Sequence, residues 1–304
     1  MEKEQLGRRN MIARAGLAVG GLVTLGSLPG CGSDDKSSTT TPPPPPPPAT
    51  PLATDFPYDQ HIAAGYQLDK AIVQEAAYHA YYAGGCCHGS FSALLDHLAS
   101  TVGAPFTLLP RDFGKFGKGG IDGYGSICGS LLGAEMIVNM IATDAAARQR
   151  MIWDLMRWYE TNKFPAYVPT TVNAAEASGL TKDFTAGNIA TLQVAPTSHL
   201  CHASVSGWCA VNAVTATSKD KLARCARLTA DVAGKAVELL NTYLAANPRA
   251  YPTIAAADPN GACDSCHTGT AVSAYPQGPS VASDMTCVSC HGDKVSGHPV
   301  APPP

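Results

Sequence analysis

Two stretches near the carboxyl end of the chain share a spacing that can hold a cofactor covalently. C-D-S-C-H begins at Cys263, and C-V-S-C-H begins at Cys287. In C-x-x-C-H, each of two thiols can form a thioether to the same haem, and the following histidine can bind the haem iron. The sequence therefore predicts two covalently bound c-type haems, one held by Cys263, Cys266 and His267 and the other by Cys287, Cys290 and His291.

Zinc and disulfides are the alternatives to haem at these two motifs. The four cysteines read together as C-x2-C-x20-C-x2-C, which falls at the edge of the spacing of a four-cysteine zinc site. Both alternatives leave the two histidines unexplained. With 9 His in 304 residues, a histidine after both pairs has a chance probability of roughly 0.001. The pattern favours haem.

Six further cysteines lie upstream, at positions 86, 87, 128, 201, 209 and 225. Three disulfides would account for them in an oxidising compartment. An iron–sulfur cluster held by four of them is the other interpretation. The adjacent pair Cys86 and Cys87 favours the cluster, because neighbouring cysteines rarely bond to each other. Cys225 shares a helical face with Leu222 and Leu228, so we expect it to point inward.

Each haem also needs a sixth ligand or an open position. His88 and His202 each follow a cysteine directly, and His298 lies seven residues beyond His291. These three are the candidate distal ligands. For each of them, a surface histidine or a hydrogen-bonded core histidine is the plainer interpretation.

The order of these blocks resembles a known family. G-G-C-C-H-G, then G-G-I-D-G-Y-G-S-I-C-G-S-L-L-G-A, then L-C-H-A-S-V-S-G-W-C with A-R-C-A-R-L, then two C-x-x-C-H motifs, resembles the split-Soret cytochrome c family. The chain is also similar to the wider redox group marked by C-G-A-x-x-G, although Ser130 replaces the alanine.

The resemblance implies an exported, dimeric protein with a helical cluster-binding domain, a cysteine-bound iron–sulfur centre and bis-histidine haems packed near the dimer interface. It does not say which four cysteines bind the cluster. We expect Cys87, Cys128, Cys209 and Cys225 as ligands, with Cys86 and Cys201 as further candidates.

The elements that must position these residues are predicted to be mainly α. Apolar residues at three- and four-residue spacing predict helices over 62–82, 91–99, 131–142, 145–160 and 218–244, the last with Ser218 as its cap. A short strand is expected within 190–194. We therefore expect a helical, cysteine-rich iron–sulfur domain over 55–250. Residues 251–304 offer almost no aliphatic side chains, so we expect an irregular dihaem segment whose centre is filled by cofactor.

The amino-terminal residues indicate export. Residues 1–31 carry the pair Arg8 and Arg9 before an Ala/Gly/Leu-rich run, which resembles a twin-arginine signal; an ordinary secretory signal is the alternative. L-P-G-C resembles a bacterial lipobox, which makes Cys31 the candidate lipid attachment site. Residues 32–54 are rich in Ser, Thr and Pro and predict a linker with a stiff polyproline segment. A periplasmic lipoprotein tethered to a membrane through Cys31 would explain both features.

Taken together, these patterns predict a periplasmic dihaem cytochrome that carries electrons between redox partner proteins, with an additional iron–sulfur centre. The alternative is a periplasmic reductase in which a haem or the cluster keeps an open coordination position. A zinc- and disulfide-stabilised binding module is the third interpretation. A formal net charge of −3 and 15% charged residues give no sign of a nucleic-acid partner. The sequence contains no motif of another catalytic class, so an electron carrier is favoured over an enzyme.

Overall fold

The computed structural model describes residues 56–176, 178–252, 267, 285–287 and 291–292. Within these residues the chain is mainly α, as predicted, and its β-structure is limited to two isolated bridges. The α-helices are α1 (Lys70–Gly84), α2 (Cys86–Thr101), α3 (Gly129–Ile141), α4 (Ala145–Thr161), α5 (Cys201–Val211) and α6 (Lys219–Ala245). Short 3-10 helices span Asp59–His61, Phe106–Leu108, Arg111–Gly117 (η3) and Ile189–Leu192.

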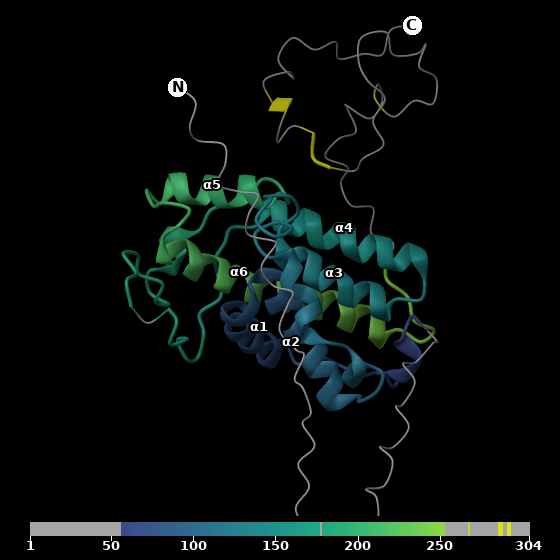
Figure 1. Cartoon of the computed structure of the whole chain (residues 1–304). Coiled ribbons are helices and arrows are strands. Elements are labelled where there is room, and N and C mark those ends of the chain that lie inside the picture. Colours follow the sequence, from purple (N-terminus) through teal and green to yellow (C-terminus); the bar gives the residue numbers. More distant parts are fainter. Residues whose placement is uncertain (1–55, 177, 253–266, 268–284, 288–290, 293–304) are drawn as a thin grey trace, which may run out of the picture. The chain divides into compact units, whose positions relative to one another are not determined.

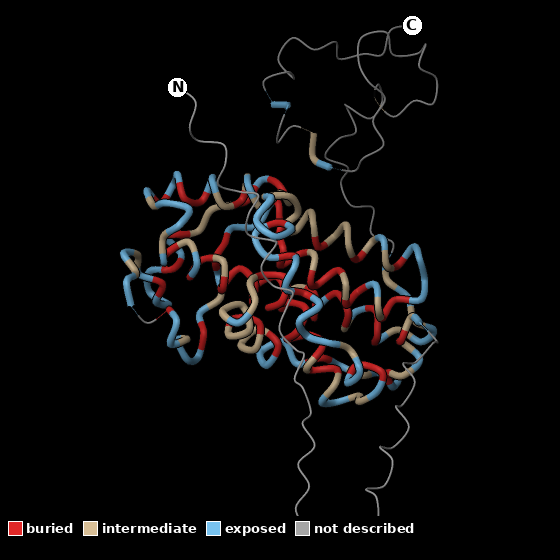
Figure 2. The backbone as a smooth tube through the Cα atoms, viewed as in Figure 1, coloured by how far each residue is buried: buried red, intermediate tan, exposed pale blue. Residues whose placement is uncertain are grey.

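The long helix α6 is the centre of the helical body. It packs against α1, α2, α3 and α4, while α2 also packs against α1, α3 and η3 (Figure 1). Figure 2 shows buried backbone running through α6 and along the inner sides of α2 and α3. Leu228, Val232, Val237 and Leu240 of α6 are at most 1% exposed. Burial of this apolar face holds the surrounding helices in place.

Three helices begin at side-chain caps that the sequence supplies. Ser218 Oγ accepts a hydrogen bond from the Lys221 amide at 3.1 Å, which confirms the predicted cap of α6. Asp144 caps α4 and Asp69 caps α1 in the same way. The cap at Asp69 corrects the expectation of a helix from residue 62. Gly65 has a φ of +74°, which takes the chain out of helical geometry before α1 begins.

The expected strand within 190–194 is not formed. Residues Ile189–Leu192 form a 3-10 helix, and Val194 makes a single antiparallel bridge with Phe164. Helix α5, in contrast, was not predicted. The spacing of Val205, Trp208 and Cys209 on one side of α5 is the helical signal that could have revealed it.

A buried ion pair joins α6 to the segment that precedes residue 177. Arg227 donates from Nη2 to Glu176 Oε1 at 2.6 Å and from Nη1 to Oε2 at 2.7 Å. Tyr78 and Tyr82 donate to the same Oε2. Although burial alone would raise the pKa of Glu176, the hydrogen bonds from Arg227, Tyr82 and Tyr78 hold it below its ordinary value. The pair fixes α1 against α6.

Several predicted features lie outside the described residues. They are the export signal, Cys31, the linker over 32–54, Cys263, Cys266, Cys290 and His298. Among the described helices, none combines the length and apolar character needed to cross a membrane.

Glu176→Gln is expected to lower the free energy of unfolding by about 3–5 kcal/mol, because it leaves the Arg227 guanidinium buried without its counter-charge. Urea unfolding followed by circular dichroism measures this. Glu238→Gln is the matched control, because Glu238 forms exposed pairs with Lys70 and Lys235. The control variant should lower the free energy of unfolding by only about 0–1 kcal/mol.

The pH dependence provides a second check on the same pair. Because the pKa of Glu176 is lowered in the folded state, its stabilisation is complete above the ordinary value of 4.5 and is lost as pH falls through the lowered pKa. The stability difference between wild type and Glu176→Gln should therefore shrink on acidification. A difference that grows below pH 4.5 would contradict this assignment.

Candidate metal centre

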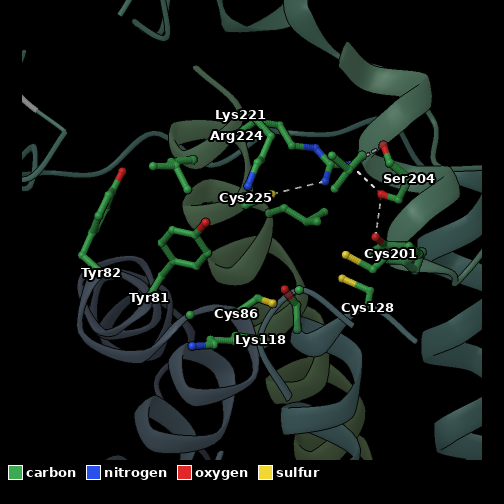
Figure 3. A pocket seen from close by; sticks show the side chains of 17 residues that line it. Tyr81, Tyr82, Cys86, Lys118, Cys128, Cys201, Ser204, Lys221, Arg224 and Cys225 are labelled. Atoms are coloured by element: carbon green, nitrogen blue, oxygen red, sulfur yellow. Dashed lines mark hydrogen bonds between the residues drawn. The ribbon is translucent and has the colours of Figure 1, made fainter. Parts of the chain in front are cut away.

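Four cysteines from four separate segments line one cavity of about 390 Å³. Cys86 is the first residue of α2, Cys128 directly precedes α3, Cys201 is the first residue of α5, and Cys225 lies on α6. Figure 3 shows the four side chains around the same space. The structure thus brings together Cys128 and Cys225 of the expected ligand set with Cys86 and Cys201 of the further candidates.

Backbone pairing holds Cys128 and Cys201 side by side. The Cys201 amide donates to Ser126 O at 2.6 Å, and the Cys128 amide donates to His199 O at 2.8 Å. Ile127 and Leu200 form an antiparallel bridge between these two bonds. Segments more than seventy residues apart in sequence therefore meet at the cavity.

The glycines of the cysteine-rich blocks permit a close approach of α3 to α2. A Cβ at Gly129 would lie 2.4 Å from Gly117 O and 2.5 Å from Cys86 Sγ. A Cβ at Gly133, one turn later, would lie 2.3 Å from Cys87 O. Any larger residue at these two positions would push α2 and its cysteines away. The C-G-x-x-x-G pattern is thus a helix-packing requirement of the site.

Ser130, which departs from the alanine of the related group, makes a specific contact. Its hydroxyl forms a 3.0 Å hydrogen bond with Thr229 Oγ1, and Thr229 in turn donates to Cys225 O at 2.8 Å. Ser130 is fully buried, so this bond satisfies the hydroxyl that replaces the alanine. The bond connects α3 to the turn of α6 that carries Cys225.

The two remaining cysteines lie apart from the cavity lining. Cys87 is fully buried beside η3, where a Cβ on Gly117 would lie 2.6 Å from its Sγ. Cys209 packs in an apolar cluster with Phe184 and Trp208. The structure therefore does not bring these two expected ligands into the cavity.

Two of the cavity thiols, Cys86 and Cys201, are hard to ionise unless a cation compensates their charge. Burial raises the pKa of Cys86, and negative charge on Cys128 and Cys225 raises it further. For the same reasons, in the same order, the pKa of Cys201 rises to about 12. A bound metal would reverse this preference, because coordination deprotonates a thiol outright.

The arrangement of the thiols bears on the kind of centre that the cavity could hold. In the described part of the chain, no three His, Cys, Asp or Glu side chains are close enough to hold one metal ion. A tetrahedral zinc would require sulfurs roughly 3.8 Å apart, from a Zn–S distance of about 2.3 Å. Four thiols spread around a cavity of about 390 Å³ fit a larger iron–sulfur core instead.

The charge of the cavity lining complements a thiolate-bound centre. Lys118, Lys221 and Arg224 line it, and none of the described lining residues is a carboxylate. Lys118 is exposed and pairs with Asp122 at 3.5 Å, whereas Arg224 is only 1% exposed. A group of net negative charge would be favoured here.

The two described candidates for distal ligand differ in environment. His88 is 7% exposed, and its Nδ1 lies 3.2 Å from Arg111 O. Since a carbonyl can only accept, Nδ1 carries the proton, and the Nε2 lone pair of the neutral ring is left for a ligand. His202 is exposed at the start of α5. In contrast, the Nε2 of His97 accepts from the Asp69 amide, and the Nδ1 of His199 contacts Glu160 Oε1.

Three residues of the C-x-x-C-H motifs are described. His267 is half-buried, Cys287 is half-buried and His291 is exposed. The His291 amide donates to Cys287 O at 2.9 Å, so one backbone bond joins the first cysteine of the second motif to its histidine.

Comparison with known proteins first defines the class. Residues 85–239 match the model of a family described as "Putative redox-active protein (C_GCAxxG_C_C)". This range contains all six upstream cysteines, including the four that line the cavity. The class is therefore a redox protein built on these cysteine and glycine positions.

The particular family follows from a relative that spans nearly the whole chain. The split-Soret cytochrome c of Desulfovibrio desulfuricans (strain ATCC 27774) is 31% identical over 289 residues, which cover 94% of each chain. A solved structure described as "A novel iron centre in the split-Soret cytochrome c from Desulfovibrio desulfuricans ATCC 27774" has a TM-score of 0.62 and 32% identity, and covers 77% of this chain and 93% of that one. The chain belongs to the split-Soret cytochrome c family, as its motifs predicted, and its role is redox electron transfer.

Proposed function

We propose that this protein is a dihaem c-type cytochrome that carries electrons in the periplasm and holds an iron–sulfur centre on Cys86, Cys128, Cys201 and Cys225. One observation carries the proposal for the second centre. Four thiols from four segments converge on one cavity, and the described residues that line it include cations but no carboxylate. The solved structure of the related split-Soret cytochrome c, which is described as having a novel iron centre, supports an iron centre in this chain.

The haems are assigned to Cys263, Cys266 and His267 and to Cys287, Cys290 and His291. When bound, the haems and the cluster supply one-electron chemistry. The polypeptide provides thioether anchors, the proximal histidines and the fixed orientation of His88. The hydrogen bond from His88 Nδ1 to Arg111 O favours the tautomer in which the lone pair of Nε2 could bind a metal. His202 and His298 are the other candidate distal ligands.

Absorption spectra of air-oxidised and dithionite-reduced protein, made in a host that attaches c-type haem, test the electron-carrier role. We expect the sharp α and β bands of six-coordinate haem, together with a divided Soret band from closely stacked haems. A high-spin spectrum that shifts with added small ligands would favour the reductase instead. A spectrum without a Soret band would refute haem at both motifs. Light scattering of the same sample tests the homodimer that the resemblance implies, and a monomer mass would contradict it.

Serine substitutions test the cluster ligands one at a time. Cys86→Ser, Cys128→Ser, Cys201→Ser and Cys225→Ser should each lose most non-haem iron and its electron paramagnetic resonance signal, while the haem content stays unchanged. Cys87→Ser and Cys209→Ser are matched controls, because these buried thiols lie outside the cavity lining. The controls should keep their iron. Equal losses in all six variants would contradict the assignment.

We propose export in the folded state and tethering through lipidated Cys31. Arg8 and Arg9 precede the apolar run of residues 1–31. If the cluster is assembled in the cytoplasm, the protein must fold around it before export, and the twin-arginine pathway exports folded proteins. Changing both arginines to lysine should leave cluster-loaded protein in the cytoplasm, as measured by fractionation. Normal periplasmic loading of that variant would overturn this route. Cys31→Ser should release the protein from the membrane fraction.

A further inference from the structure

Arg224 is a buried cation without a carboxylate partner among the described residues. It is only 1% exposed on α6 and lies directly beside Cys225. Arg227, one turn further along the same helix, is equally buried but forms a two-bond ion pair with Glu176. Of these two buried arginines on one helix, Arg227 thus has a carboxylate as its counter-charge, and Arg224 needs another source of negative charge.

The contacts of Arg224 aim its guanidinium at the cavity. Nη2 donates to Ser204 Oγ at 2.7 Å, and Tyr159 donates to the same oxygen at 2.8 Å. Nη1 points to Cys225 Sγ at 3.8 Å, while Nε is buried without a hydrogen-bond partner. Figure 3 shows Arg224 and Ser204 on the side of the cavity that carries Cys225 and Cys201. Ser204 and Tyr159 fix the side chain but are neutral partners.

A buried charge requires a counter-charge, because removing an ion from water costs several kcal/mol that neutral hydrogen bonds only partly return. Asp231 lies two turns further along α6 and accepts from the Ala166 amide at 2.9 Å. Burial raises the pKa of Asp231 to about 7 even though the charge of Arg224 lowers it, and no ion pair joins the two among the described residues. The source of negative charge in direct contact with the guanidinium is therefore the set of cysteines around the cavity, when they are thiolates bound to a centre.

From these contacts we infer that Arg224 is a positioning residue that acts through Cys225: it orients the thiolate and acts as the counter-ion of the iron–sulfur centre, and so raises the reduction potential of that centre. This inference rests on the proposed centre. Reduction adds one electron and hence one negative charge to the cluster. A fixed cation beside it stabilises the reduced form more than the oxidised form, and the low dielectric of a buried site strengthens the effect.

The test is a redox titration of the full-length, haem-loaded protein, followed by the resonance signal of the cluster. Arg224→Gln removes the charge and keeps a hydrogen-bonding side chain. It should shift the reduction equilibrium at least tenfold toward the oxidised form, which is about 59 mV for a one-electron couple. Arg224→Lys keeps the charge and should shift the equilibrium by less than tenfold.

Lys235→Gln is the matched control. It removes one positive charge from the same helix, eleven residues or roughly 16 Å further along, beyond the Debye length at physiological salt. We expect no measurable shift of the cluster potential. Equal shifts in Arg224→Gln and Lys235→Gln, or a shift in neither, would overturn the inference.

Assembly of the centre provides the second readout. A centre that is lost in Arg224→Gln and retained in Arg224→Lys would support the counter-ion, whereas a centre lost in both, with unchanged helical circular dichroism, would overturn it. If Arg224→Gln does not fold, Arg224→Lys decides: a retained potential supports the inference, and a drop of about 59 mV or more refutes it. Failure of the proposed centre itself is distinguished by the wild type, which would then contain no non-haem iron.

Discussion

The antiparallel pairing of residues 125–128 with 199–202 is the contact on which the site depends. Its backbone bonds bring the start of α3 to the start of α5, and with them Cys128 to Cys201. Backbone bonds of this kind need no particular side chain, so the loops around them can be glycine-rich. Gly120, with a φ of +70°, lies so close that a Cβ there would be 2.8 Å from Cys201 Cβ. A side chain at Gly120 would therefore collide with Cys201, so the close packing of this loop on Cys201 requires glycine there.

Further contacts place α2 and α6, with their cysteines, next to the paired segments. Gly129 and Gly133 let α2 approach until Cys86 reaches the cavity, and Ser130 and Thr229 join α3 to α6 at the turn that carries Cys225. Burial of α6 on several sides makes this arrangement rigid. A rigid scaffold suits electron transfer, because geometry that does not change on reduction keeps the cost of reorganisation low.

Helix type and the convergence of cysteines could be predicted from the sequence, whereas the choice among the cysteines could not. Apolar spacing marked α2, α3, α4 and α6, and Ser218 marked the start of α6. Cys86 and Cys87 are adjacent on a helix and so point about 100° apart, and only the packing partner decides which of these two buried thiols faces the cavity. That partner is Gly129, which is met more than forty residues later. Local periodicity carries no such information.

The charges of the groups around the cavity, more than the shape of the cavity, support the proposed occupant. Burial raises the pKa of Cys86 and of Cys201, so these two thiols stay protonated unless a bound cation compensates their charge. A lining of protonated thiols would leave Arg224 as an uncompensated buried cation, which is a costly arrangement. The proposed thiolate-bound iron–sulfur core would remove both costs at once, because the iron would compensate the thiolates and the net negative charge of the assembly would compensate the guanidinium. The buried arginine and the cysteines therefore support the same proposal.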